Sequence, residues 1–250
     1  MQTFNLQGPG RLILNGAGLG KTANGVLQLS GGTLDGPGSL VLTGPLLWTA
    51  GTVTGTGLLQ FGGISMIKVG GDAHLSRRTL VNAGVLNWFS GSLNTGSGSV
   101  ISNMPGAFLV ISNDVSIYTE GTNGPGVFHN AGVLRKIAGA GGGNSGIADI
   151  FYNTGVVEAQ VGNLFFNGGG NNRGSNAVWA GATLGFGGGT NILDAASIVT
   201  GPGNVLFQSS LTEISGLYTI TGTNTLLWYG RATFHRPGLA LNALKVNGVS

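Results

Sequence analysis

The sequence predicts an all-β fold in which the chain winds into a parallel β-helix, or β-solenoid, of about 20 residues per coil. The first observation is an internal repeat, because residues 26–42 align with residues 45–61 at a shift of nineteen positions. The second is composition: 50 of the 250 residues are glycine and 8% are charged, against about 7% glycine and about 25% charge in ordinary domains. The third is that short alternating apolar runs, without a 3.6-residue period, fill the intervals between the glycines.

The aligned positions indicate which side chains form the core, because the same places are apolar in each copy of the repeat. A further copy begins near Leu80, and its register shifts by one residue after Asn94. Stacked coils bury one face of each strand against their neighbours. The predicted core contains Leu27, Leu29, Leu34, Leu40, Leu42, Trp48, Val53, Leu59, Phe61, Leu86, Trp88, Leu93 and Val100.

Gly-x-Gly triplets mark the corners between strands. They occur at residues 36–38, 55–57, 96–98, 124–126 and 201–203, each followed by a short apolar run. Glycine permits positive φ and proline fixes the middle position, which is the chemistry of a tight turn. The whole predicts one elongated domain of about twelve coils, which at about 4.8 Å per stacked strand is roughly 60 Å long. The solenoid is expected over residues 1–235, with residues 236–250 as a tail or partial cap that offers Leu239, Leu241, Leu244 and Val246 as apolar contacts.

A second signature joins asparagine to a glycine two residues later. It occurs at Asn82, Asn130 and Asn153, each time before a β-branched residue. These side chains are candidates for sugar or metal ligands, but asparagine also stacks on asparagine in the next coil and bonds to the turn backbone. We therefore interpret them as a structural ladder. Residues 137–149 and 167–176 are the least strand-like stretches and are expected to be loops, beside which a functional site would lie.

The charge distribution and the short sequence motifs indicate which classes of function are not expected. The net charge of +3 is spread out, and Arg77/Arg78 and Arg135/Lys136 are the only adjacent basic pairs, so nucleic-acid binding is not expected. The chain has no cysteine, no apolar stretch that could span a membrane and no visible signal peptide. Residues 14–22 end in Gly-Lys-Thr and imitate a phosphate-binding loop. A strand pattern follows, however, where the motif needs a helix.

Residues 75–88, 128–143, 151–170 and 181–189 together resemble the repeats of large bacterial surface and secreted proteins of the autotransporter-passenger and adhesin kind. Their shared patterns are Asn-x-Gly-x-hydrophobic and Gly-x-Leu-x-Phe-x-Gly-Gly, and the resemblance covers about residues 25–230. It implies a right-handed parallel β-helix, an extracellular or cell-surface location and mainly a rigid structural role. Such repeats specify the architecture much better than the activity.

Parallel β-helices include polysaccharide lyases and glycosidases, whose sites need converging carboxylates. Of eight acids, only Asp149 and Glu158 lie near each other and near an expected loop, and on adjacent coils they could face one another. The simpler interpretation is that each is an isolated, outward-facing charge. His74, His129 and His235 lack metal-ligand spacing and are expected at the surface. The Leu-x-Trp tryptophans are either platforms for sugar rings or, as we predict, core residues: Trp48, Trp88 and Trp228.

These observations predict a non-catalytic structural or adhesive β-helical segment of a larger bacterial cell-surface or secreted protein, without catalytic residues, metal or cofactor. The alternative is a carbohydrate-active enzyme or a glycan-binding module on the same scaffold. Expected partners are a glycan or a host or cell surface, and flanking modules of the same polypeptide. Because the first residues enter the repeat pattern at once, end-to-end self-association through an open strand edge is also expected.

Overall fold

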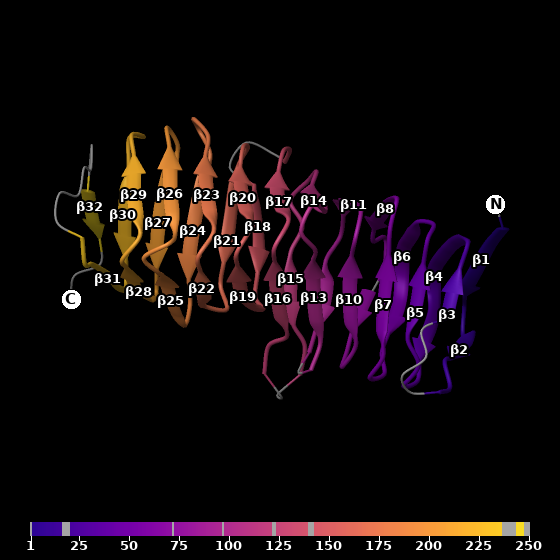
Figure 1. Cartoon of the computed structure of the whole chain (residues 1–250). Helices are drawn as coiled ribbons and strands as arrows, with labels where there is room; N and C mark the ends of the chain where they lie inside the picture. The colour runs from indigo at the N-terminus through magenta and orange to yellow at the C-terminus, as the bar shows by residue number, and fades with distance from the viewer. Residues whose placement is uncertain are drawn as a thin grey trace.

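A computed structural model of the chain describes residues 2–16, 21–71, 73–96, 98–121, 124–139, 143–236 and 244–247. Within these ranges the chain forms strands, turns and bends and no helix, which confirms the all-β fold. Parallel strands stack about 21 residues apart and build a β-solenoid of about 11 turns, one fewer than predicted. Figure 1 shows the coils side by side along one long axis, with the N-terminal and C-terminal coils at opposite ends.

Each turn contributes strands to three stacks, which we call faces 1, 2 and 3 in chain order. Faces 1 and 2 belong to one 21-stranded sheet, because β4 (Gly25–Asp35) and β6 (Leu46–Val53) bend from face 1 into face 2. The other strands of face 1 are β1 (Gln2–Gln7), β8 (Ile64–Lys68), β11 (Val85–Ser90), β14 (Phe108–Ile111), β17 (Val133–Lys136), β20 (Val156–Ala159), β23 (Ser175–Val178), β26 (Ile198–Gly201) and β29 (Leu217–Ile220). The other strands of face 2 are β2 (Arg11–Ile13), β9 (Ala73–Leu75), β12 (Leu93–Thr95), β15 (Ile117–Thr119), β18 (Asn144–Ile147), β21 (Asn163–Phe166), β24 (Thr183–Gly187), β27 (Asn204–Gln208), β30 (Thr225–Trp228) and β32 (Leu244–Asn247). Face 3 is the 11-stranded sheet of β3 (Lys21–Ala23), β5 (Leu40–Leu42), β7 (Leu58–Phe61), β10 (Thr79–Asn82), β13 (Val100–Asn103), β16 (Val127–Asn130), β19 (Ile150–Asn153), β22 (Gly170–Asn172), β25 (Thr190–Leu193), β28 (Leu211–Ile214) and β31 (Arg231–Phe234).

The core lies inside the three faces, and all predicted core residues except Val100 and Trp228 are buried. Val100 is only half-buried, and the inward residue of β13 is Ile101. Ile101 pairs with Leu80, which pairs with Leu59 in the coil before. Side chains of a strand alternate between its two sides, so the one-residue register error put Val100 on the wrong side.

The predicted Gly-x-Gly corners connect the strands, and two constraints require glycine there. Gly36 and Gly55 have φ of 99° and 94°, a region that residues with a Cβ rarely adopt. In addition, a Cβ at Gly57 would overlap the carbonyl oxygen of Gly38 in the previous coil. The triplets therefore provide both the turn and the close stacking of successive turns.

The two stretches that were expected to be loops, residues 137–149 and 167–176, contain β-strands of the solenoid instead. Residues 144–147 form β18, and residues 140–142 lie outside the described residues. Residues 167–176 contain β22 and the start of β23. The expectation failed because stacking, and not strand propensity, decides these segments: Asn172 pairs in register with Asn153 of the preceding coil.

A ladder of buried asparagines joins five successive strands of face 3 and confirms the structural interpretation of the Asn-x-Gly signature. The side-chain Nδ2 atoms donate to the Oδ1 atom of the next member at 2.8, 2.8, 2.8 and 3.1 Å. Asn82, Asn130 and Asn153 were identified from the signature, whereas Asn103 and Asn172 were not. The members are Asn82, Asn103, Asn130, Asn153 and Asn172.

Part of the C-terminal tail continues the stack. Strand β32 pairs in parallel with β30, and the side chains of Leu244 and Val246 are about half exposed. Leu239 and Leu241, two other predicted contacts of a cap, lie outside the described residues. Within the described ranges there is no helix with the length and apolarity that crossing a membrane requires.

Candidate functional site

The two candidate catalytic carboxylates, Asp149 and Glu158, lie in separate environments. Asp149 is fully buried between β18 and β19, where its Oδ1 accepts hydrogen bonds from Thr95 Oγ1 at 2.6 Å and Gly126 N at 3.0 Å. Burial raises the pKa of Asp149, and these two hydrogen bonds oppose that rise. Glu158 on β20 forms an ion pair with Arg135 Nε at 2.5 Å. The prediction of two isolated, outward-facing charges is therefore wrong, because Asp149 points inward and Glu158 is paired.

Each adjacent basic pair places one of its members inside the solenoid. The side chain of Arg78 is buried and donates to the backbone oxygens of Gly36 and Thr54, both at 2.6 Å. It also donates to the carbonyl oxygens of Gly38 at 3.0 Å and Leu58 at 3.2 Å. These four carbonyl groups belong to the corners of the two preceding coils, so the guanidinium joins its own coil to both of them.

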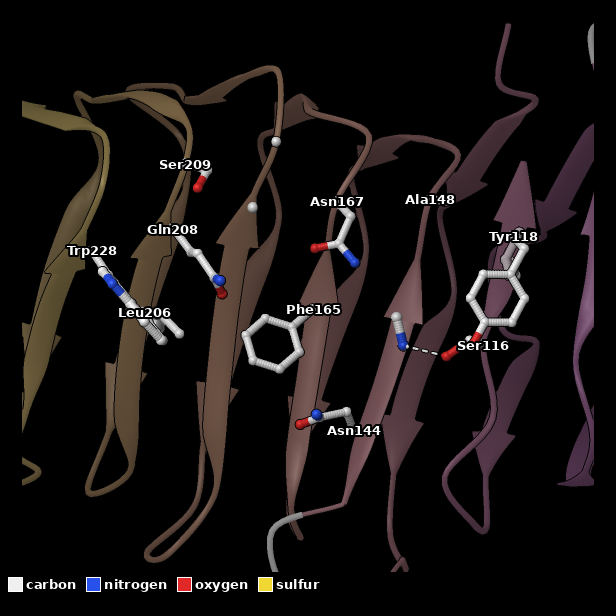
Figure 2. Close-up of a pocket in the computed structure, with 14 residues that line it drawn as sticks. Ser116, Tyr118, Asn144, Ala148, Phe165, Asn167, Leu206, Gln208, Ser209 and Trp228 are labelled. Carbon is white, nitrogen blue, oxygen red and sulfur yellow. Dashed lines mark hydrogen bonds between the residues drawn. The ribbon is translucent and has the colours of Figure 1, made fainter. Parts of the chain in front are cut away.

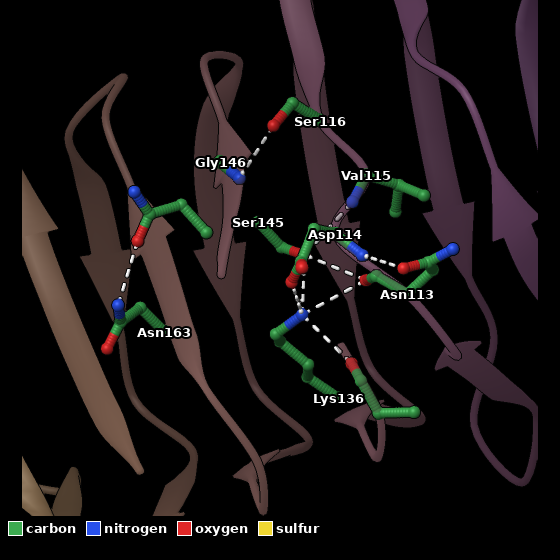
Figure 3. A network of polar contacts seen from close by, with 10 residues as sticks. Asn113, Asp114, Val115, Ser116, Lys136, Ser145, Gly146 and Asn163 are labelled. Carbon is green, nitrogen blue, oxygen red and sulfur yellow. Dashed lines mark hydrogen bonds and ion pairs between the residues drawn. The ribbon is translucent and has the colours of Figure 1, made fainter. Parts of the chain in front are cut away.

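Lys136 is the second buried cation. Its Nζ donates to Asp114 Oδ1 at 2.8 Å and to Ser145 Oγ at 3.0 Å. The carbonyl oxygens of Asn113 and Ala138 also accept from it, each at 3.0 Å. Figure 3 shows these groups converging on the ammonium between neighbouring coils. Arg78 and Lys136 therefore serve internal structure and do not contribute to a basic surface.

The histidines do not gather into a metal site. His74 and His235 pair with Glu120 and Glu213, each at 2.7 Å, on the surface. His129 stacks on Tyr152, with ring centroids 5.2 Å apart. Across the described part of the chain, no group of three His, Cys, Asp or Glu side chains is placed to hold a metal ion.

Two further sequence candidates also have structural explanations. In the segment that imitates a phosphate-binding loop, residues 17–20 lie outside the described residues, and β3 follows as a strand paired with β5. Trp48 and Trp88 are buried as predicted, but Trp228 is 42% exposed. The Trp228 prediction is wrong because Leu227 takes the inward position beside Phe207, which turns the next side chain outward.

The surface feature best suited to binding is a groove on the outside of face 2, which we call the outer groove. It crosses β15, β18, β21, β24, β27 and β30 and has a volume of about 680 Å³. Figure 2 shows Tyr118 at one end, Phe165 in the middle and Trp228 at the other end. Its lining consists of Ser116, Ile117, Tyr118, Asn144, Gly146, Ala148, Phe165, Asn167, Gly187, Gly188, Leu206, Gln208, Ser209 and Trp228.

Glycines contribute to the outer groove, since Gly146, Gly187 and Gly188 belong to its lining. One outward row runs Gly146, Phe165, Gly185 and Leu206 in register, so a ring alternates with positions that lack a side chain. A Cβ at Gly185 would overlap the ring of Phe165, which means that the ring leans over this glycine. Glycine inside a strand often marks a site of close approach.

The groove is electrically neutral and holds unused polar groups. None of its lining residues is charged. Among the described residues, no hydrogen bond is formed by the side chains of Asn167, Gln208 and Tyr118. An amide carries both donors and acceptors, so these side chains can meet a ligand that does the same.

Sequence reasoning missed the outer groove, although one signal for it was present. In residues 183–187, Thr-Leu-Gly-Phe-Gly, the period of two predicts inward Leu184 and Phe186 and outward Gly185 and Gly187. What could not be read was which residues of other coils lie beside them. The groove exists only in the stacked register of six coils.

No protein-family model matches the sequence, and no curated protein and no solved structure is significantly similar to it.

Proposed function

We propose that this chain is a rigid, non-catalytic β-helical segment of a larger bacterial cell-surface or secreted protein, and that its outer groove is adhesive. The structural part is supported by how the distinctive polar residues are used. The asparagine ladder, Arg78 and Lys136 all bond between coils and hold the stack together. The bacterial surface or secreted origin is supported by the repeat motifs alone.

The observation that carries the adhesive function is the outer groove itself. It extends over several coils, exposes aromatic rings and holds no charged side chain. General acid–base catalysis needs titratable groups within hydrogen-bond reach of the reacting atoms. Glycoside hydrolysis in particular uses two carboxyl groups on either side of the bond, whereas Asp149 and Glu158 belong to separate networks. The groove is thus suited to hold a ligand without converting it.

Incubation of the purified chain with neutral and acidic polysaccharides tests the absence of catalysis. We expect retention on at least one immobilised polysaccharide and no release of reducing ends or unsaturated products. Measured turnover that scales with the amount of folded protein would contradict the proposal.

The location is tested separately. Antibodies against the chain should label intact bacteria that produce the full-length protein, or detect it in the culture medium. Detection in the cytosolic fraction alone would contradict a surface or secreted role and would leave the binding measurements unaffected.

A further inference from the structure

We propose that the outer groove binds a flat, extended and uncharged polysaccharide chain that lies parallel to the solenoid axis. This inference rests on the proposed adhesive function and adds the chemical class of the ligand and its direction.

The direction follows from the position of the aromatic rings. Tyr118, Phe165 and Trp228 lie on β15, β21 and β30, and all three belong to the lining of one groove. Five inter-strand steps separate the first coil from the last, which corresponds to roughly 24 Å. A ligand that contacts all three rings must therefore be long and run across the strands. A single sugar ring could reach only one of them.

The ring faces are available for stacking. Phe165 leans over Gly185, and Figure 2 shows its ring face on in the middle of the groove. Tyr118 and Trp228 are 56% and 42% exposed. Exposed aromatic rings of this kind offer a large apolar surface at little cost in conformational entropy. The flat faces of equatorially substituted sugar rings present C–H groups that pack on such a surface.

The polar groups beside the rings match hydroxyl groups. Asn167 lies on one side of Phe165 and Asn144 on the other (Figure 2), and Gln208 is two coils further on. Each amide donates and accepts, as does each sugar hydroxyl. Asn144 is held in place because its Oδ1 accepts from Asn163 Nδ2 at 2.8 Å. Such positioning lowers the entropy lost on binding.

Other ligand classes fit the groove less well. A peptide that binds as an added strand needs an open sheet edge, but here β18, β21, β24 and β27 have paired neighbours on both sides. An acidic polysaccharide or a nucleic acid needs cations, and the lining contains none. An uncharged carbohydrate can bind through stacking on aromatic rings and hydrogen bonds to side-chain amides, and the groove contains both kinds of group.

The test is calorimetric titration of the 250-residue chain with a β-1,4-linked glucose hexaose. The disaccharide of the same series and polygalacturonate serve as comparison ligands. We expect the hexaose to bind and the disaccharide to bind at least about tenfold more weakly, because it spans a small part of the groove. Phe165→Ala and Trp228→Ala should each weaken hexaose binding about tenfold or more. Trp179→Ala is the matched control, since Trp179 is 51% exposed but lies outside the groove lining.

Circular dichroism and thermal unfolding of each variant identify any loss of binding that is due to misfolding. Gly185→Ala tests the role of the Phe165 ring by a second substitution, because the added Cβ displaces the ring without removing it. Binding that is equal for hexaose and disaccharide, or unchanged in both Phe165→Ala and Trp228→Ala, would overturn the inferred site. Binding of polygalacturonate alone would overturn the ligand class while the adhesive function stands. Absence of binding to every polysaccharide tested would overturn both the inference and the adhesive role.

Discussion

Asn103 donates a hydrogen bond from its side-chain Nδ2 to Oδ1 of Asn130, 2.8 Å away and one coil further along the solenoid. Asn130 in turn donates to Asn153 Oδ1 at 2.8 Å and to the Val156 carbonyl oxygen at 3.0 Å. These three asparagines are buried. Each inner member is therefore donor and acceptor at once, and it links the coil before it to the coil after it.

Replacing Asn130 with alanine should destabilise the solenoid by about 3 kcal/mol, because buried groups on Asn103, Asn153 and Val156 lose their partner. Urea unfolding followed by circular dichroism measures this loss. Asn94→Ala is the control, since Asn94 is half-buried and forms no side-chain hydrogen bond among the described residues. Equal midpoints for the two variants would mean that the ladder adds nothing to stability.

The ladder shows what could be predicted from the sequence. Asn82, Asn130 and Asn153 stand before a glycine two residues later, and all three are buried. Asn82 and Asn153 form the turn that this spacing indicates, because each Oδ1 accepts from the backbone N–H of that glycine. Asn103 is followed by Met-Pro-Gly, so its turn is different, and only the register with Asn82 and Asn130 brings it into the ladder. The local turns could be predicted from the sequence, whereas the pairing between coils of unequal length could not.

The buried guanidinium of Arg78 leads to a second prediction. Arg78→Lys should lower the urea midpoint, with a loss of about 2 kcal/mol, because one ammonium cannot reach four carbonyl oxygens that a planar guanidinium contacts. Arg77→Lys is the matched control at the neighbouring exposed position, and we expect no measurable change there. A stability of Arg78→Lys equal to that of the parent chain would contradict the proposed role.

Lys136 and Arg135 allow a buried and a surface ion pair to be compared in adjacent residues. Lys136→Met removes a fully buried ammonium from Asp114 and from three further oxygen acceptors, and should cost about 3–5 kcal/mol. Arg135→Met breaks the partly exposed pair with Glu158 and should cost about 0–1 kcal/mol. Chemical unfolding of both variants gives the comparison. Similar losses in the two would show that the Lys136 ammonium gains nothing from its enclosed position.

These two basic pairs also show why the candidate site could not be predicted. In the sequence, Arg78 and Lys136 are surface charges by every ordinary expectation. They are inside because the corners of other coils, Asp114 and Ser145 supply their hydrogen-bond partners. The outer groove has the same origin, since Phe165 lies over Gly185 only after two coils have stacked. Side-chain alternation was visible in each strand, but contacts between coils depended on corner lengths that vary.

Self-association is a further prediction. Strands β1 and β2 pair only with β4, and β3 pairs only with β5, so one side of each has no strand neighbour among the described residues. An apolar opening of about 540 Å³ lies beside Leu12 and Leu14. Open edges of this kind invite pairing with another chain. Light scattering coupled to size-exclusion chromatography should show a mass that rises with concentration for the 250-residue chain, and a constant monomer mass would contradict this.

The last prediction concerns Asp149 and the dependence of stability on pH. Burial raises the pKa of Asp149, so folding favours its protonated form. Its contribution to stability is complete below the pKa of the unfolded chain, about 3.9, and is lost as the pH rises through the higher folded pKa. Asp149→Asn removes this loss and should be more stable than the parent chain at neutral pH.

Other carboxylates change the stability with pH in the opposite direction. The quantity to measure is therefore the difference in stability between the variant and the parent chain. A hydrogen bond from Arg11 lowers the pKa of Asp35, and that contribution is lost as the pH falls through the folded pKa. We therefore subtract the parent's urea midpoint from that of Asp149→Asn at each pH. The contribution of Asp35 is common to both chains and cancels, so the difference reports the contribution of Asp149. The difference should grow from acid to neutral pH, because only the parent chain must bury a carboxylate whose Oδ2 has no hydrogen-bond partner among the described residues. A difference that does not change with pH would show that Asp149 keeps an ordinary pKa in the folded chain.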